Sequence, residues 1–267
     1  MMAEYRARVE AALGAACDRS GLAPLLRESM RYGVLGGGKR IRPCLLLCTV
    51  EMLGSSPDAA LPYASALEMI HCYSLIHDDL PAMDNDDFRR GKPSTHKQFG
   101  EANGLLAGDG LLTAAALLLS EQPGHDAAKT AILSAALDMV SGQSYDLNPM
   151  ERSEALLHEL HRQKTGALFR AATESAAHLA DREDLAPSFA KLGETVGLLF
   201  QITDDLLDAD RDIAEDKFTF VTYYGAERAR AYAEQAAAQA LSILAPFENG
   251  AADALKKTVR ALCQRTE

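Results

Sequence analysis

The sequence predicts an all-α protein that folds as a single-domain helical bundle. Apolar residues recur at helical spacing through long stretches of the chain. Alanine and leucine are abundant, tryptophan is absent, and the alternation of β-branched residues that is typical of strands is scarce. No Gly/Ser-rich or Pro-rich linker and no internal repeat divides the 267 residues. We therefore expect one α-helical domain that covers residues 1–267.

Glycines and prolines separate the expected helices. We expect helices over residues 3–18, 22–34, 40–53, 58–78, 101–120, 125–145, 152–180, 184–210, 222–244 and 250–264. We expect breaks at Gly36 to Gly38, Gly54 to Pro57, Pro81, Gly91 to Pro93, Gly124 and Pro149. Segments 105–119 and 196–207 are apolar on nearly all sides, which is typical of helices in the centre of a bundle.

The bulk composition excludes several classes of function. The formal charge is 27 minus 38, or −11, and no basic stripe is present, which argues against a nucleic-acid partner. None of the five cysteines forms a CxxC or a Cys/His zinc spacing, so we expect reduced thiols in a cytoplasmic protein. The N-terminus is typical of an amphipathic helix rather than of a signal peptide. No uninterrupted apolar run approaches the roughly 20 residues of a transmembrane helix, so we expect a soluble chain.

One aspartate cluster lies near the end of the apolar segment 196–207. Asp204 and Asp208 lie about 40° apart on the same helix face, and Gln201 shares that face. Like charges at this spacing repel each other, and carboxylates on a central helix are unfavourable unless they are paired or bind metal. A divalent cation would reverse the repulsion, so the pair is a candidate metal site.

A second aspartate cluster, residues 78–87, contains Asp78 and Asp84 on either side of Pro81. On a regular helix, side chains six residues apart would diverge by roughly 120°. Pro81 cannot continue the helix, because it lacks an N–H and clashes with the preceding turn. We therefore expect the helix to end or bulge there, which would bring Asp84 back beside Asp78.

Carboxylates without cysteine or histidine partners favour Mg²⁺, which completes its coordination with water and substrate phosphate. The alternative for each cluster is a solvated acidic helix end. The glycine pattern of an EF-hand is absent, which argues against a calcium loop.

Cations collect beside glycines in this acidic chain. Lys39, Arg40 and Arg42 follow Gly36 to Gly38, and Arg89-Arg90 follow the first aspartate cluster. Further cations are Lys164 and Lys217. Glycines allow close backbone approach, and arginine forks match phosphate oxygens. His71 lies on the same helix face as Asp78, either as a core residue or as a donor to a second anion. No catalytic triad, GxGxxG or P-loop motif is present.

These residues resemble those of a known family. The chain resembles the trans-isoprenyl diphosphate synthases, particularly the bacterial short-chain farnesyl diphosphate synthase type. The matching segments are GGGKRIRP (36–43), EMIHCYSLIHDDLPAMDNDDFRRGKPSTHKQFGEANGLLAGDGLL (68–112), GQSYDL (142–147), QKTGALF (163–169) and FQITDDLLD (200–208). They span most of the chain in the expected order, and the first aspartate segment with its double arginine is highly specific.

The resemblance implies a bundle around a deep central cavity, usually as a homodimer. It implies a prenyltransferase that condenses isopentenyl diphosphate with dimethylallyl or geranyl diphosphate, giving farnesyl diphosphate. Mg²⁺, as more than one ion bridged by the allylic diphosphate, would be bound by Asp78, Asp84, Asp204 and Asp208, with Asp79 and Asp205 in support. The implied catalytic residues are Asp78, Asp84, Asp204, Arg89 and Lys164. The allylic diphosphate would contact Arg89, Lys164, Thr165, Gln201 and Lys217, and isopentenyl diphosphate would contact Lys39, Arg42, His71 and Arg90.

In this family, the residues just before the first aspartate motif set product length. Here they are Tyr73 and Ser74, as in farnesyl-forming relatives. Ser74 lies about 40° from Asp78 on a helical wheel, whereas Tyr73 lies about 140° away. The loop after Asp208 is shorter than in relatives and lacks one expected lysine. Lys217 matches the later lysine, and Arg211 is a candidate substitute for the missing one.

Three alternatives remain open. The first is a geranylgeranyl or other short-chain prenyl diphosphate synthase. The second is a class I terpene cyclase, and the third is a non-catalytic modulatory subunit of a prenyl synthase. A cyclase would not need a second diphosphate site. A modulatory subunit would be expected to lose metal-binding aspartates, and both clusters are intact here.

Overall fold

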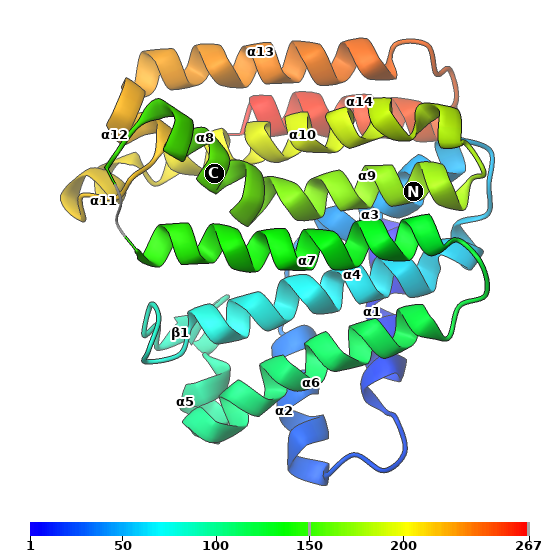
Figure 1. Cartoon of the computed structure of the whole chain (residues 1–267), viewed down its shortest axis with the longest axis vertical. Helices are drawn as coiled ribbons and strands as arrows, with labels where there is room; N and C mark the ends of the chain where they lie inside the picture. The colour runs from blue at the N-terminus through cyan, green and yellow to red at the C-terminus, as the bar shows by residue number, and fades with distance from the viewer. Residues whose placement is uncertain (149–150, 266–267) are drawn as a thin grey trace. The chain divides into compact units, whose positions relative to one another are not determined.

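The computed structural model describes residues 1–148 and 151–265 and confirms the all-α prediction (Figure 1). The chain divides into two compact units. Unit 1 comprises Met1–Leu47 and Ser56–Lys129, and unit 2 comprises Cys48–Ser55 and Thr130–Glu267. The predicted break at Pro149 lies outside the described residues.

Unit 1 is built around a long helix that ends at the first aspartate cluster. Its elements are α1 (Met2–Cys17), α2 (Pro24–Val34), the first part of α3 (Ile41–Met52), α4 (Pro57–Asp78), β1 (Phe88–Arg89), β2 (Lys92–Pro93), α5 (Thr95–Phe99), α6 (Glu101–Ser120) and the start of α7 (Asp126–Leu147). α4 begins at a Ser56 cap with Pro57 in its first turn, and α6 packs along it (Figure 1).

Glycines on α6 permit close packing against α4 and α5. A Cβ at Gly108 would lie 2.0 Å from His77 Nε2 on α4, and one at Gly104 would lie 3.0 Å from His96 Cβ on α5. His77 Nε2 also lies within hydrogen-bond distance, 3.0 Å, of the Leu105 carbonyl oxygen. The absence of side chains at these two glycines therefore sets the distance between the helices.

Gly108→Ala should lower the free energy of unfolding by about 2 kcal/mol, because the new methyl group overlaps His77. The matched control is Gly14→Ala on α1, where the nearest atom to the new Cβ lies 3.8 Å away. The control should be neutral or stabilising by up to about 1 kcal/mol, since alanine favours helix. Urea unfolding of both variants checks this. Equal effects would show that helix propensity, not the α4–α6 contact, governs both sites.

α6 differs from its predicted central position. Leu105, Leu106 and Leu117 are 47%, 52% and 43% exposed, so one side of the helix is left uncovered. Contrary to our expectation, α6 is also long and apolar enough to cross a membrane by length and composition. Core helices of soluble proteins meet the same criterion, and α6 buries Ala107 and Leu111 in unit 1.

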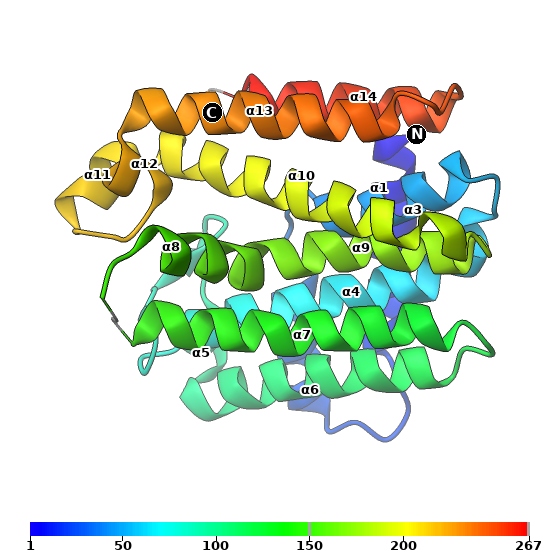
Figure 2. The same ribbon diagram turned by 45° about the horizontal axis from the view of Figure 1, so that its top comes forward.

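Unit 2 is organised around the helix that carries the second aspartate cluster. Its elements are the ends of α3 and α7, α8 (Glu154–His161), the π-helix η1 (Arg162–Gly166), α9 (Ala167–Leu179), the 3₁₀ turn η2 (Glu183–Leu185), α10 (Ala186–Leu207), α11 (Ala209–Ala214), α12 (Phe220–Tyr224), α13 (Ala226–Leu244) and α14 (Gly250–Cys263). α10 lies beside α9 and α13 (Figure 2), and it also contacts η1, α12 and α14. This confirms the predicted central position of segment 196–207.

The structure subdivides several predicted helices. The expected helix 152–180 is α8, η1 and α9 in succession, and the expected helix 184–210 starts with η2 and ends at Leu207. The β1–β2 hairpin and the short helices α5 and α11 were not predicted. In the hairpin, Arg90 and Gly91 adopt φ values of 54° and 75°, a left-handed turn whose only sequence signal is Gly91.

Candidate functional site

At the first aspartate cluster the chain leaves α4 in a tight series of turns. The Asp84 amide donates to the Asp78 carbonyl oxygen at 2.8 Å, and the Met83 and Asn85 amides donate to Leu80 at 2.9 and 3.1 Å. α4 thus ends at Asp78, and the backbone of Asp84 returns to it, as the proline argument predicted. The Asp84 side chain is exposed.

Asp79, in contrast, is turned into the protein. Its side chain is only 3% exposed, and it accepts hydrogen bonds from Arg89 Nε at 2.9 Å and from Arg89 Nη2. Burial raises the pKa of Asp79, while Arg89 opposes the shift. Arg89 also reaches Asp86 at 3.2 Å. The Asp79 carboxylate is therefore engaged by Arg89, which fits support of the cluster better than direct ligation of a metal.

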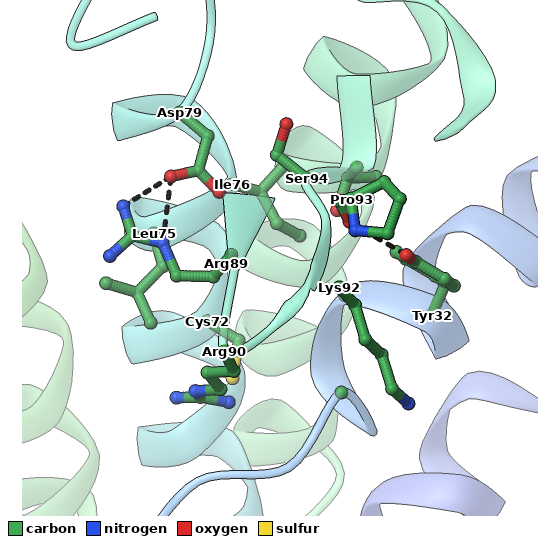
Figure 3. A pocket seen from close by; sticks show the side chains of 13 residues that line it. Tyr32, Cys72, Leu75, Ile76, Asp79, Arg89, Arg90, Lys92, Pro93 and Ser94 are labelled. Atoms are coloured by element: carbon green, nitrogen blue, oxygen red, sulfur yellow. Dashed lines mark hydrogen bonds and ion pairs between the residues drawn. The ribbon is translucent and has the colours of Figure 1, made fainter. Parts of the chain in front are cut away.

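A pocket in unit 1 is lined by both hairpin arginines, which Figure 3 shows, and by Gly36 of the glycine run. Its lining includes Gly36, Cys72, Asp79, Arg89 and Arg90. Arg90 donates to the Gly37 carbonyl oxygen. Gly38 has φ 122°, and a Cβ there would lie 2.7 Å from Arg90 Cζ. The glycines thus permit close approach of Arg90 to the backbone, an intramolecular role that the sequence did not reveal.

His71 lies in the electrostatic field of the same cations. Burial lowers its pKa well below the usual value, and Arg42, Arg90, Arg40 and Arg89 lower it further. The imidazole is therefore neutral at neutral pH. This places His71 near Arg42 and Arg90, two of the residues with which the family resemblance groups it. The contact of His71 with a substrate remains a prediction. The substrate contacts of Lys39 and Arg42 also remain predictions, and Lys39 is exposed.

Arg40 has a structural role that sequence reasoning missed. The residue is 2% exposed, and its guanidinium bonds Glu68 at 2.7 Å, Glu10 at 2.8 Å and the Val34 carbonyl oxygen at 2.5 Å. Glu10 and Glu68 are 30 and 28 residues away in the chain. The sequence gives no local signal for such pairs, so Arg40 could not be separated from its neighbouring cations.

The second aspartate cluster keeps helical geometry. The Asp208 amide donates to the Asp204 carbonyl oxygen at 3.0 Å, which confirms the predicted one-turn spacing. Asp204 forms an ion pair with Arg265 at 2.5 Å, and Asp208 forms one with Arg211 at 2.9 Å. The sequence did not predict the Arg265 contact. Arg211 does lie at this cluster. That it takes the place of the missing lysine remains a prediction.

Asp205 is at the centre of a hydrogen-bonded chain that crosses unit 2. Thr165 Oγ1 donates to Gln201 Oε1 at 2.6 Å, and Gln201 Nε2 donates to Asp205 Oδ1 at 2.7 Å. The Phe220 amide donates to Asp205 Oδ2 at 2.8 Å. Burial raises the pKa of Asp205 to about 7. Asp205 thus holds the start of α12 against α10 and positions Gln201, and its two oxygens are both engaged.

The predicted cations of unit 2 pair with acids. Lys164 Nζ contacts Asp146 at 2.5 Å, and Lys217 Nζ contacts Glu215 at 2.8 Å and Asp212 at 3.9 Å. Lys164 and Thr165 lie on the π-helix η1, a distortion often found at functional sites. Their roles toward diphosphate, and those of Gln201 and Lys217, remain predictions.

The two predicted chain-length residues diverge on α4, in agreement with the helical wheel. Tyr73 is 5% exposed and makes an edge contact with the His77 ring, with centroids 5.7 Å apart. Its buried hydroxyl has no hydrogen-bond partner among the described residues. Ser74 Oγ instead donates to the His71 carbonyl oxygen at 2.9 Å.

The carboxylates suit an ion that a substrate helps to coordinate. Among residues 1–148 and 151–265, no three His, Cys, Asp or Glu side chains form a group that could hold a metal ion by themselves. Mg²⁺ typically binds one or two carboxylates and completes its shell with water and phosphate oxygens. Each of the pairs Asp78/Asp84 and Asp204/Asp208 supplies two carboxylates for this mode of binding, and their role as metal ligands remains a prediction.

Comparison with known proteins finds relatives that match most of the chain. A sequence model of the family described as polyprenyl synthetase matches residues 23–261. The chain is 41% identical over 225 residues to a farnesyl diphosphate synthase of Micrococcus luteus, covering 77% of each protein. It is 39% identical over 247 residues to a geranylgeranyl diphosphate synthase of Cyanophora paradoxa, covering 84% of this chain and 82% of the relative.

A solved structure supports the fold. The crystal structure of a geranyltransferase from Legionella pneumophila matches with a TM-score of 0.90 and 35% identity, covering 99% of this chain and 96% of that chain.

Proposed function

Because this chain belongs to the polyprenyl synthetase family and is a prenyltransferase, we propose that it condenses isopentenyl diphosphate with dimethylallyl or geranyl diphosphate to give farnesyl diphosphate. The observation that carries the proposal is the pair of intact aspartate clusters in a chain of this family. Asp78 and Asp84 meet at the end of α4, and Asp204 and Asp208 lie one turn apart at the end of α10.

In this proposal the allylic diphosphate is the leaving group. Mg²⁺, held by Asp78, Asp84, Asp204 and Asp208 together with the diphosphate, would supply positive charge to the departing oxygens. Arg89, Lys164 and Lys217 add fixed positive charges, which stabilise a transition state in which diphosphate charge develops. Thr165 and Gln201, already linked by a hydrogen bond, supply polar contacts beside Lys164.

The second substrate is assigned to the basic residues of unit 1. Lys39, Arg42 and Arg90 would bind the diphosphate of isopentenyl diphosphate, and the neutral imidazole of His71 would donate a hydrogen bond to it. The alkene of this substrate attacks the allylic carbon, and a proton is then lost to the departed diphosphate. No side-chain general base is needed, in keeping with the absence of a catalytic triad in the sequence.

The decisive assay uses purified protein, Mg²⁺, isopentenyl diphosphate and either dimethylallyl or geranyl diphosphate, with products sized by chromatography. We expect farnesyl diphosphate. A C20 product would instead support the geranylgeranyl alternative, which the Cyanophora paradoxa relative favours. Cyclic hydrocarbons would indicate a terpene cyclase. The absence of any product with either primer would reject the enzyme and favour a modulatory subunit.

Tyr73→Ala should lengthen the product beyond fifteen carbons. Removing the buried ring opens space beside α4, because Tyr73 is only 5% exposed. Ser74→Ala, which removes only a hydroxyl bonded within its own helix, is the matched control and should leave the distribution nearly unchanged. Chromatography of the dephosphorylated prenols measures both. A C15 product from Tyr73→Ala would remove Tyr73 as the limit on chain length.

We further propose that the chain is a cytoplasmic homodimer in which both units form one domain with a deep central cavity. A single family model spans both units. Apolar side chains that a partner copy could cover are exposed on α6 and, separately, along one stripe of α7. The α7 stripe consists of Leu133, Leu137, Val140 and Leu147.

Leu137→Glu should weaken this dimer, because Leu137 is 71% exposed and a charge in an apolar interface is unfavourable. Analytical ultracentrifugation should show a dimer for the parent chain and a larger monomer fraction for the variant. Leu25→Glu, at an exposed leucine of α2, is the control. A parent chain that sediments as a monomer would contradict the proposal.

A further inference from the structure

Unit 2 contains another pocket, formed by α8, η1, α10 and α13. Its volume is about 170 Å³, and its lining includes His161, Arg162, Lys191, Glu194, Thr195 and Gln239. None of these residues takes part in the proposed prenyl transfer. Gly166 also lines the pocket, close to the π-helix residues Lys164 and Thr165.

His161 is a buried polar side chain without a partner. It is 6% exposed, and neither ring nitrogen has a hydrogen-bond partner among the described residues. Burial lowers its pKa to about 3, so the ring is neutral and offers one N–H donor and one acceptor. Its face packs on Phe220, with centroids 5.2 Å apart and planes 31° apart. This packing leaves both in-plane nitrogens without a hydrogen-bond partner, which is unfavourable for buried polar atoms.

The charges on the pocket lining favour an anion. Within the lining, Arg162 and Lys191 carry positive charges and Glu194 a negative charge, while Glu159, which pairs with Arg162, lies outside the lining. Lys191 lies 3.7 Å from Glu194 and is half-exposed, so it can reorient toward a ligand at little cost. Arg162 is held by Glu159 at 2.6 and 2.8 Å.

The remaining lining groups suit the polar, uncharged part of a small ligand. Thr195 Oγ1 donates to the Lys191 carbonyl oxygen at 2.8 Å and also lies 3.3 Å from Gln239 Oε1, so the Gln239 amide adds a further polar group to the lining. Leu198 contributes apolar surface. His161 lines the pocket but its nitrogens are buried, so we expect the ring to tilt when a ligand supplies their missing partner.

We propose that this pocket is a binding site for a small organic anion, with one carboxylate or phosphate group paired to Lys191 and Arg162 and a compact body that hydrogen-bonds His161. The proposal does not depend on the proposed catalytic function, because its residues are separate from the predicted substrate contacts.

The test follows the histidine side-chain signals of the full-length protein by NMR, using ¹³C-labelled histidine. His161→Phe identifies the His161 signal among the seven histidines by its disappearance, and His161→Gln serves if the phenylalanine variant does not fold. The probes are acetate, glycolate and methyl phosphate, with ethylene glycol as the uncharged control. The titrations are run without Mg²⁺ and with a metal chelator, so that the aspartate clusters hold no metal ion that could bind the probe.

We expect at least one anion to shift the His161 signal saturably, while ethylene glycol does not. Lys191→Ala should weaken that binding about three-fold. Lys257→Ala, an exposed lysine of α14 outside the pocket, should leave it unchanged. The proposal is overturned if the His161 signal moves only when ionic strength moves all histidine signals, if ethylene glycol acts as the anions do, or if both lysine variants bind equally well.

Discussion

Asp78→Asn should lower the rate of prenyl transfer by about a thousand-fold, the largest effect that we expect from one substitution. The change preserves size and the Asp84–Asp78 backbone hydrogen bond but removes the negative charge that attracts Mg²⁺. Loss of one preorganised electrostatic contact at a reacting group typically costs 10²–10³ in rate. Steady-state kinetics with geranyl and isopentenyl diphosphate, over a range of Mg²⁺ concentrations, measures the effect.

Asp87→Asn is the matched control, because Asp87 lies in the same acidic segment but pairs with Lys97 at 2.7 Å. It should change the rate by less than about three-fold. If the two variants were equally active, Asp78 would have no special role. Equal loss in both would point to the net charge of the segment rather than to a metal ligand.

The second large effect concerns Arg89. Arg89→Ala should lower both the stability and the rate, because it leaves the Asp79 carboxylate, 3% exposed, without its partner. Breaking a fully buried ion pair costs about 3–5 kcal/mol, and we expect about 2 kcal/mol here because Arg89 is 36% exposed and partly screened. The rate should fall by about a hundred-fold through loss of a cation at the diphosphate.

A double variant separates these two roles of Arg89. In Asp79→Asn/Arg89→Ala the buried charge is gone, so most of the lost stability should return while the rate stays low. Urea unfolding and steady-state kinetics on the single and double variants provide the comparison. Recovery of the rate together with stability would show that Arg89 acts only by pairing with Asp79.

Features governed by local chain geometry could be predicted from the sequence. The end of α4 before Pro81 and the one-turn spacing of Asp204 and Asp208 follow from single-residue rules, and both are confirmed. The subdivision of helix 152–180 was missed, because helical periodicity continues through the π-helix η1. The period of the apolar pattern alone does not reveal such a change of hydrogen bonding.

Features that depend on distant partners could not be predicted. Arg40 is one of three cations that follow a glycine run. Its structural role comes from ion pairs with Glu10 and the buried Glu68, which are distant in the sequence. Asp205 sits beside Asp204 in sequence but faces Gln201 and the Phe220 amide. Adjacent residues on a helix point about 100° apart, so neighbouring aspartates need not share a role. The apolar character of α6 predicted a central helix and did not show that Leu105, Leu106 and Leu117 stay exposed.

The central claim of the proposed function is that the aspartate clusters bind diphosphate through Mg²⁺. Isothermal titration of inorganic diphosphate into the protein, with and without Mg²⁺, tests this on the parent chain, Asp78→Asn and Asp204→Asn. We predict binding that requires Mg²⁺ and is weakened at least ten-fold by either substitution, since each removes a carboxylate ligand. Binding that is independent of Mg²⁺, or unchanged when either aspartate is replaced, would contradict the account.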